Sequence, residues 1–469
     1  MGRQRCGNGR WVIVAVVAVS SGLVHPARAS DAPDWRRYEA EYAASRSRAA
    51  SDPIPSFSRQ TGLTCNVCHT AFPQLTAFGR LFKLNGYTLT GLQTVQTTGE
   101  QPSLKIDLIP PVSAMVQTSG TVVNTTVPGQ QNADVQFPQE LSVFLGEEIS
   151  PRMGTFIQIT YDPEAGSLAL DNTDIRFATH AKFASRDMIL GLTLNNNPTV
   201  QDVWNTTPAW GFPFASSEIA PAPSATPLIT DALAQQVAGL GAYALWNGLV
   251  YGEVSAYRSA PQGASQAPDA SSSNTIHGVS PYWRLALQHA WGTRYLEIGT
   301  YGLDAKIYPT GIAGLTDRYT DLALDGQYEQ PMLGGNFTLY GTWIHERQHL
   351  DATFDAGGSD NSFNRLNTVK VNATAYSKAR VGGTVGYFST TGDTDAGLRP
   401  PEEVSGSATG SPNSNGVITE LDWMPWLNTR LTAQYVFYNK FNGATTGYDG
   451  FGRKASANNT LYLLAWFAF

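Results

Sequence analysis

The sequence predicts a mainly β protein, in which an antiparallel barrel of about 16 strands follows a small helical module at the N-terminus. Three observations predict this fold class. Segments of roughly ten residues with alternating polarity recur after residue 103, clusters of Gly, Asn, Asp, Pro and Ser separate them, and the last segment ends on an aromatic residue. This pattern is typical of a transmembrane β-barrel, because lipid-facing and lumen-facing side chains alternate along each strand.

The N-terminus has the organisation of an export signal. Three arginines make its first part basic: Arg3, Arg5 and Arg10. An apolar run covers residues 11–24, and Ala27-Arg28-Ala29 matches an A-x-A cleavage site. A transmembrane anchor is the alternative, but the run is short for a hydrocarbon layer of about 30 Å. We therefore predict that residues 1–29 are a cleaved signal peptide.

Cleavage changes both the charge and the cysteine content of the chain. The removed segment carries four arginines and no acid, so 31 basic residues become 27 against 38 acidic ones, and the net charge moves from −7 to −11. A nucleic-acid partner is not expected, because phosphate binding needs a basic surface. Cys6 is removed with the signal, and only Cys65 and Cys68 remain.

These two cysteines belong to a C-x-x-C-H motif that ends at His69. The spacing places two thiols where they add to the two vinyl groups of haem, and the adjacent imidazole then lies under the iron. A redox C-x-x-C would need a thioredoxin-like context, and a zinc site would need more ligands, whereas the next histidine downstream is His180. We predict one covalently bound haem c, with Cys65 and Cys68 as thioethers and His69 as an axial iron ligand.

The residues around the motif predict a small α-helical c-type cytochrome module at 30–100. Apolar residues at helical spacing would give one face of a helix: Phe72, Leu75, Phe78 and Phe82. We expect this face to pack as ordinary helix core and, in part, against the porphyrin. A barrel of about 16 strands has a lumen wide enough for a small domain. We therefore expect the module to plug the lumen, at least partly.

Residues 101–469 are predicted to form the barrel. The candidate strands are 104–118, 135–148, 152–162, 168–180, 187–195, 236–246, 249–258, 281–290, 293–304, 318–330, 335–347, 366–377, 380–389, 416–424, 429–439 and 459–469. Connections after even-numbered strands are short, whereas most of those after odd-numbered strands are long, including 196–235, 259–280, 348–365, 390–415 and 440–458. Short periplasmic turns opposite long external loops are typical of bacterial barrels, so the module begins on the periplasmic side.

The final segment supports an outer-membrane barrel independently. Alternate residues on one face of this strand are all apolar: Leu461, Leu463, Ala465, Phe467 and Phe469. The chain ends on phenylalanine, a familiar feature of bacterial outer-membrane barrels. A soluble β-sandwich is the alternative, but it explains neither the alternation of loop length nor the aromatic end. We expect the mature protein to lie in the bacterial outer membrane, in contact with its lipid.

The order of signal peptide, single haem motif and barrel resembles the fused outer-membrane monohaem cytochrome–porins of iron-oxidising and related bacteria. The resemblance is carried by Phe57-Ser58-Arg59-Gln60-Thr61-Gly62, Cys65 to His69, Phe72-Pro73-Gln74-Leu75, Phe78-Gly79-Arg80, Asn85-Gly86-Tyr87, Tyr438-Asn439-Lys440-Phe441-Asn442-Gly443 and Asn459-Thr460-Leu461-Tyr462. It covers both modules, whereas the middle of the barrel matches by architecture alone.

The resemblance implies electron transfer across the outer membrane, from extracellular Fe(II) in the best-known members. Such a protein would take electrons from Fe(II) or another reduced donor and pass them to a periplasmic carrier such as a soluble cytochrome. We expect an electron-transfer protein with Fe(II)-oxidising activity and no catalytic side chains of its own. Two alternatives stay open: a porin-like solute channel whose haem module is a plug or redox sensor, and electron flow in the reverse direction.

The motif does not supply the sixth iron ligand, for which Met115 is the leading candidate. Ser113, Met115 and Gln117 share the parity that is expected to face the lumen. A thioether ligand raises the reduction potential, which suits the oxidation of a weak donor such as Fe(II). Two alternatives remain: Met115 packs against the plug without binding iron, or His180, on the same parity as Arg176, is the ligand.

The long loops carry two further features. Acidic residues suited to hold cations lie in two of them: Asp351, Asp355 and Asp360 in one, and Asp393, Asp395, Glu402 and Glu403 in another. Carboxylates are hard ligands suitable for Fe(II), although solubility also explains charged loops. The segment 196–235 is rich in Pro and aromatic residues, and it would form a constriction if it folded inward.

Overall fold

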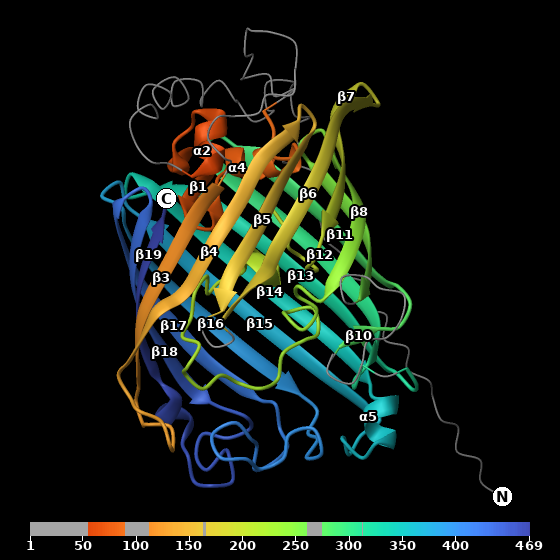
Figure 1. The fold of residues 1–469 in the computed structure, drawn as a ribbon, viewed down its shortest axis with the longest axis vertical. Coiled ribbons are helices and arrows are strands. Elements are labelled where there is room, and N and C mark those ends of the chain that lie inside the picture. The colour runs from red at the N-terminus through yellow and green to blue at the C-terminus, as the bar shows by residue number, and fades with distance from the viewer. Residues whose placement is uncertain (1–54, 90–111, 163–165, 260–273, 312) are drawn as a thin grey trace, which may run out of the picture.

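Strands dominate this computed structural model, which describes residues 55–89, 112–162, 166–259, 274–311 and 313–469. The described strands form one antiparallel sheet of 17 strands and a separate sheet of two. One of the 17, β10 (Thr275–Ile276), has only two residues, and the other sixteen close into a barrel (Figure 1). The predicted fold class is confirmed. The predicted signal peptide (residues 1–29), residues 30–54 and residues 90–111 lie outside the described residues.

The long strands keep the order of the chain around the barrel. They are β3 (Val112–Val123), β4 (Asp134–Ser150), β5 (Met153–Asp162), β6 (Ser167–Phe183), β7 (Arg186–Asn195), β8 (Val237–Trp246), β9 (Val250–Ser259), β11 (Ser280–Trp291), β12 (Arg294–Tyr308), β13 (Asp317–Met332), β14 (Gly335–His349), β15 (Phe363–Tyr376), β16 (Val381–Gly392), β17 (Ser414–Trp426), β18 (Thr429–Lys440) and β19 (Thr460–Ala468). The barrel closes where β19 pairs with β3, from Thr460 opposite Val123 to Ala468 opposite Met115.

Each predicted strand overlaps one of these strands, and the largest difference concerns the first. The sequence predicted 104–118, whereas β3 ends at Val123 and residues 104–111 lie outside the described part of the chain. The small polar residues after Gln117 resemble a turn when they are read locally. In the barrel, Ser119 and Thr121 are buried on the lumen side and pair with β4, so the strand continues through them.

The two ends of the barrel differ in their connections. At one end the strands are joined by short turns, 151–152, 184–185, 247–249, 292–293, 333–334, 377–380 and 427–428. At the other end most of the described connections are long, including 196–236, 393–413 and 441–459. We call these ends the short-turn end and the long-loop end. The helical module and the C-terminus both lie at the short-turn end (Figure 1).

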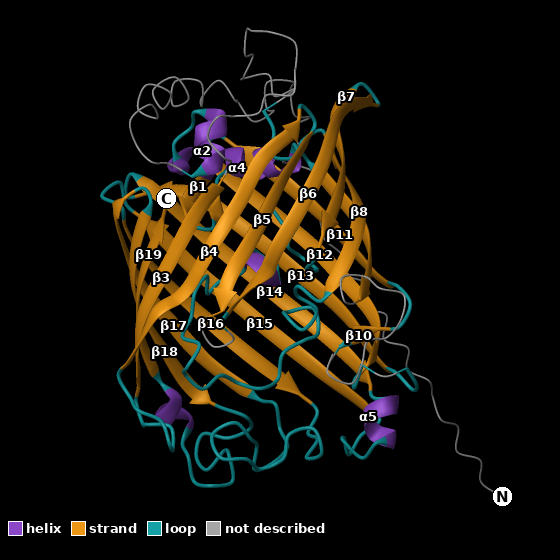
Figure 2. Cartoon of the chain, in the orientation of Figure 1, coloured by secondary structure: helices purple, strands orange, loops and turns teal. Residues whose placement is uncertain are grey.

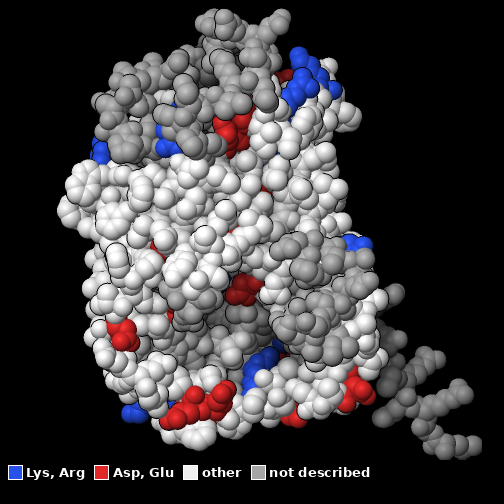
Figure 3. Space-filling view, viewed as in Figure 1, with Lys and Arg blue, Asp and Glu red and all other residues white. Residues whose placement is uncertain are grey.

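The two faces of the wall have opposite polarity. Apolar side chains on the outer face are exposed, among them Leu192, Leu240, Val254, Leu285 and Ile298. Charged side chains on the inner face are buried, among them Arg176, Glu253, Arg284, Glu297 and Asp325. The wall in Figure 3 is mostly uncharged, with Lys, Arg, Asp and Glu concentrated towards the two ends. An apolar belt outside a polar lumen is the arrangement that a lipid environment favours.

The helical segments gather mainly at the short-turn end (Figure 2). There the module contains α2 (Ser56–Thr61), α3 (Cys65–Cys68), β1 (His69–Ala71), β2 (Gln74–Leu75) and α4 (Ala77–Leu84). The other short helices are η1 (Pro208–Trp210), α5 (Asp351–Asp355) and η2 (Ala455–Asn458). None of the helices in the described residues is long and apolar enough to cross a membrane.

Candidate haem site

The C-x-x-C-H motif forms a single helical turn followed by an extended residue. Cys65 and Cys68 begin and end α3, so their side chains lie on neighbouring positions of one helix face. His69 leaves the helix with extended backbone and starts β1. Both cysteines are free, and the hydroxyl of Ser58 lies 3.9 Å from the sulfur of Cys65. Two thiols and an imidazole are therefore presented together.

Thr76 and Gly79 fasten this turn to α4. The Thr76 hydroxyl donates to the carbonyl of Val67 (2.5 Å) and accepts from the backbone N–H of Gly79 (3.1 Å). A Cβ atom at Gly79 would lie 2.2 Å from the carbonyl oxygen of Cys68, so no larger residue fits without displacing the motif. The sequence after the motif thus sets the position of its backbone.

The predicted helix face was only partly right. Phe78 and Phe82 are buried in α4, but Phe72 and Leu75 precede the helix, which begins at Ala77. Pro73 accounts for the difference, because proline has no N–H and disrupts the interior of a helix. The residues between the motif and α4 instead form the short hairpin of β1 and β2.

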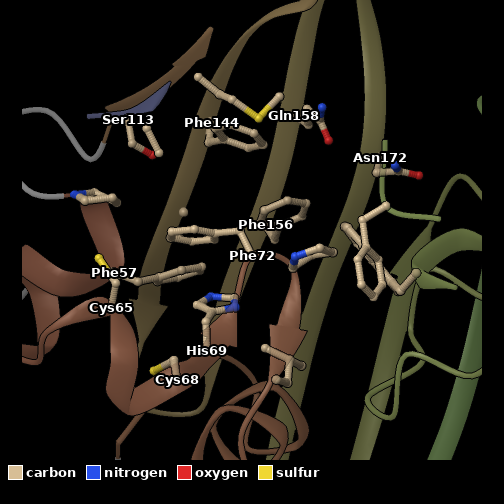
Figure 4. A pocket seen from close by; sticks show the side chains of 18 of the residues that line it. Phe57, Cys65, Cys68, His69, Phe72, Ser113, Phe144, Phe156, Gln158 and Asn172 are labelled. Atoms are coloured by element: carbon tan, nitrogen blue, oxygen red, sulfur yellow. The ribbon is translucent and has the colours of Figure 1, made fainter. Parts of the chain in front are cut away.

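The motif borders a cavity of about 890 Å³ inside the barrel mouth. Its lining includes Cys65, Cys68 and His69 from the module, Met115 from β3, and Trp210 from the segment 196–236. Figure 4 shows the two cysteines and His69 on one side, with Phe144, Phe156, Gln158 and Asn172 from the wall across from them. Cofactor-sized sites in proteins span roughly 300–1,000 Å³.

The surroundings of His69 suit an imidazole that binds a haem iron. Its ring lies 4.6 Å from the ring of Phe72, and its buried Nδ1 has no hydrogen-bond partner. Burial lowers the pKa of His69 to about 4, and the nearby backbone of Pro73 and Gln74 opposes this only in part. The ring is therefore neutral at physiological pH, which is the form that binds a metal. The residues present fit a haem iron.

The cysteines do not have the properties of a redox pair. Burial raises the pKa of both thiols, to about 12 for Cys68, where the neighbouring Cys65 adds to the effect. Reactive cysteines in C-x-x-C pairs have lowered pKa values, because the thiolate is the nucleophile. The raised pKa values of the two thiols therefore do not match a pair that exchanges with a disulfide.

Met115 faces the lumen, as its parity on the strand predicted. Its side chain is 4 % exposed and borders the same cavity as His69. The amide of Gln117 donates to the Met115 sulfur at 3.7 Å. Ligation of iron by Met115 stays a prediction. His180 is not among the residues that line the cavity, and its Nε2 donates to the Asn85 side chain at 2.7 Å.

The module is held in the barrel mouth from several sides. The contacts are Arg80 to Glu329 (2.6 Å), Arg430 to the Phe72 carbonyl (2.8 Å), Tyr87 to Asp174 (2.8 Å), Tyr243 to the Leu84 carbonyl (2.7 Å) and His180 to Asn85 (2.7 Å). The partners in the wall belong to β6, β8, β13 and β18. Attachment around the circumference fixes the cavity between module and wall.

The segment 196–236, which we call the inward loop, folds into the lumen as the sequence suggested. Its Asn205 side chain accepts from the backbone N–H of Leu75 at 3.0 Å. Lys83 of the module donates to the carbonyls of Val200 and Asp202 at 2.7 and 2.8 Å. The inward loop therefore meets the module, and the cavity lies where the module, the loop and the wall come together.

The structure does not assemble the acidic residues of the long loops into an iron site. Asp395 accepts from the backbone N–H groups of Asp360, Asn361 and Leu398, and so ties two loops together. Within the part of the chain that the structure describes, no group of three or more His, Cys, Asp or Glu residues is placed to hold a metal ion. Asp360 and Asp393 likewise accept from backbone N–H groups of neighbouring loop residues, so these carboxylates and Asp395 serve loop structure.

Two residues that shape the site, Thr76 and Glu140, were not singled out from the sequence, and Gly79 was noted only as part of the family resemblance. Glu140 lies opposite Gln117 on the neighbouring strand and borders the cavity. The lumen-facing parity of Gln117 was visible in the sequence. Its pairing with Glu140 depends on the strand register, which one sequence does not supply.

Comparisons with known proteins show distant likeness to barrels. No protein-family model and no curated protein matches the chain. Among solved structures, it is similar to an anion-selective porin from Comamonas acidovorans, with 11% identity, a TM-score of 0.46, and coverage of 76% of this chain and 98% of that one. OmpF of Salmonella typhi, in complex with daunomycin, has 11% identity, a TM-score of 0.45, and coverage of 76% and 97%. OmpT of Vibrio cholerae has 9% identity, a TM-score of 0.42, and coverage of 76% and 96%.

These likenesses are too distant to carry an argument about activity. The resemblance to cytochrome–porins therefore continues to rest on the sequence motifs.

Proposed function

We propose that this chain is an outer-membrane c-type cytochrome fused to a porin-like barrel, which transfers electrons from extracellular Fe(II) to a periplasmic carrier such as a soluble cytochrome. Cys65 and Cys68 would hold one haem covalently, and His69 would bind its iron. Met115 is the proposed sixth ligand. The haem would supply reversible one-electron exchange, and the chain would supply its place, its ligands and its surroundings.

One observation carries the proposal. The complete motif and a lumen-facing methionine, 46 residues apart in sequence between His69 and Met115, border one cavity of about 890 Å³. Aromatic side chains such as Phe144 and Phe156 form its wall, as a porphyrin requires. The thioether and the imidazole are the ligand pair that raises haem potentials in c-type cytochromes.

The proposed location in the outer membrane rests on the wall of the barrel. Its outer face is apolar, and its charged groups are turned inward. A closed barrel is one of two ways in which a chain satisfies its backbone hydrogen bonds in lipid.

A solute channel in which the module is a plug or a sensor uses the same wall, so function must be tested directly. The purified full-length protein is expected to retain haem after denaturation, because thioether bonds survive unfolding. Stopped-flow mixing with Fe(II) should reduce the haem within the time that the mixing experiment resolves. The matched control is Cys65→Ala/Cys68→Ala, which should give neither signal. A haem that stays oxidised in a barrel that conducts ions would support the channel instead.

A further inference from the structure

We infer that four basic side chains on the outer face of the barrel bind the phosphate groups of membrane lipids. They are Lys306 on β12, Arg318 on β13, Arg347 on β14 and Arg365 on β15, and we call them the basic row. All four are exposed. The inference goes beyond the proposed electron transfer, because it rests on the proposed place in the outer membrane and does not involve the haem.

Strand pairing brings the four residues together at the long-loop end. Lys306 lies directly opposite Arg318, and Arg347 lies directly opposite Arg365. Arg318 also faces His349, two residues from Arg347, so the two pairs are diagonal neighbours. Directly opposite side chains have Cβ atoms about 4.5–5.5 Å apart, and like charges in such positions repel each other. An anion between the four side chains would remove this repulsion.

Only one acid on the outer face of these strands lies close to the basic row. Asp304 forms an ion pair with Arg318 at 2.9 Å and accepts from the hydroxyl of Thr320 at 2.8 Å. The other three members of the row form no ion pair with any described residue, including the exposed Asp351 and Asp355 of α5. Four cations against one acid leave a net charge of +3 on this part of the wall.

The basic row lies where the apolar wall ends. Along β13, Arg318 and Thr320 are followed on the outer face by Leu322 and Leu324, which are both exposed. A strand rises about 3.4 Å per residue, so Arg318 lies roughly 14 Å along the strand from Leu322. Lipid headgroups border the hydrocarbon at such a level, and long basic side chains reach towards them.

This charge is confined to one sector of the barrel. At the same end of β17, β18 and β19, the outer face carries Asn415, Asn439 and Leu461. The Asn439 amide donates to the Asn415 side chain at 3.1 Å, and Leu461 is exposed. A uniform coat of basic residues that served solubility would place cations there as well. The sector β12–β15 is therefore distinct from the rest of the wall.

Phosphate is the anion that suits three arginines and a lysine. A guanidinium group is always charged and forms two parallel hydrogen bonds with phosphate oxygens, and lysine adds a point charge. The guanidinium carbon of Arg365 lies 5.0 Å from the centre of the Phe363 ring, which helps to hold this group on the outer face. A lipid keeps its phosphate at the level of the row at a high local concentration. We therefore assign the site to lipid phosphate rather than to the free anion.

The test is the binding of phosphatidic acid to the full-length protein in a neutral detergent, with bound lipid counted by native mass spectrometry. Arg347→Gln/Arg365→Gln should weaken binding about 25-fold, because each basic residue near an anionic lipid surface contributes about fivefold, and Lys306→Gln should weaken it about fivefold. The matched control, Arg186→Gln/Arg294→Gln, removes two exposed arginines at the short-turn end and should bind as the wild type does. Equal losses in the two double variants would overturn the inference.

Denaturant unfolding separates a lost lipid site from a damaged barrel. Without lipid, Arg347→Gln/Arg365→Gln should be no less stable than the wild type, because it removes a like-charged pair. Phosphatidic acid should raise the unfolding midpoint of the wild type and leave that of the variant unchanged. An equal rise with inorganic phosphate alone would reject the lipid as the ligand. Reduction of the haem by Fe(II) should be the same in both proteins, so failure of this inference is distinguishable from failure of the proposed function.

Discussion

The inward loop divides the lumen into two unlike halves. Towards β11–β14 it is fastened to the wall by buried charged and polar groups. Towards β3–β6 and the module it leaves the cavity of about 890 Å³. The same loop therefore fills one side of the lumen and leaves a space on the other.

The packed half is built around Arg284. Its guanidinium lies 2.6 Å from Asp325, 3.3 Å from Glu297 and 3.6 Å from Asp202 of the inward loop. Further along the loop, the backbone N–H groups of Leu228 and Ile229 donate to Glu346 and Asp321. These contacts hold the loop against one wall.

The open half is bordered by rings rather than by ion pairs. Phe156 lies 5.6 Å from Phe144 and 6.0 Å from Trp210 of the inward loop, measured between ring centroids. The inward loop therefore has two roles. Its charged contacts brace it on one side, so that its aromatic side can border a cofactor-sized space on the other.

The largest effect is expected from a substitution in the open half, at the proposed iron ligand. Met115→Ala should remove the sulfur-to-iron absorption band. It should also lower the midpoint potential by a sizeable part of the range of about 0.8 V over which axial ligands set haem potentials. The reason is that a thioether ligand favours the reduced iron. A redox titration with visible spectra measures both. Met332→Ala removes an exposed methionine on the same barrel and serves as the control. An unchanged potential in Met115→Ala would reject this ligand.

The second largest effect is expected from a substitution in the packed half, and it concerns the free energy of unfolding. Arg284→Met leaves three buried carboxylates without their partner, and loss of one member of a buried ion pair costs roughly 3–5 kcal/mol. Denaturant unfolding in lipid or detergent should show this loss, with covalent haem still attached. Arg318→Met is the control, because its ion pair with Asp304 is about half exposed and should contribute at most about 1 kcal/mol. Equal losses in the two variants would contradict the bracing role of Arg284.

The smallest effect is expected from a substitution that tests how closely α4 holds the backbone of the C-x-x-C-H motif. Gly79→Ala forces a methyl group against the Cys68 carbonyl, and overpacking of this kind costs about 1–3 kcal/mol. The cost should fall on the module, so less of the purified protein should carry haem, while the barrel keeps its unfolding profile. Gly383→Ala, where a Cβ atom would make ordinary contacts at 3.6 Å, is the control. Full haem occupancy in Gly79→Ala would show that the motif tolerates displacement.

Much of the fold was predictable because its signals are local. The alternation of polarity along each strand and the alternation of loop length are readable without any contact information, and all the predicted strands overlap observed ones. The first strand is the exception: its predicted end was residue 118, and only the pairing of residues 119–123 with β4 and β19 shows that the strand continues to Val123.

The candidate site was predictable to the extent that it is contiguous. Cys65, Cys68 and His69 carry their meaning in their spacing, and Met115 was placed towards the lumen by parity. His180 has the same inward parity, yet it contacts Asn85 and not the cavity. The parity of a residue shows which face of the strand it occupies, but not how far along the barrel axis it lies. Parity alone therefore could not show that Met115 borders the cavity and His180 does not.

The sequence by itself determined which residues carry chemistry and which face of each strand they occupy, because spacing and period-two alternation are properties of adjacent residues. The tertiary structure decided which of them meet. Strand register set Glu140 beside Gln117, and closure of the barrel brought the inward loop against the module. These contacts join residues far apart in the chain, and their geometry follows from hydrogen-bonded pairing across the whole sheet rather than from any local pattern.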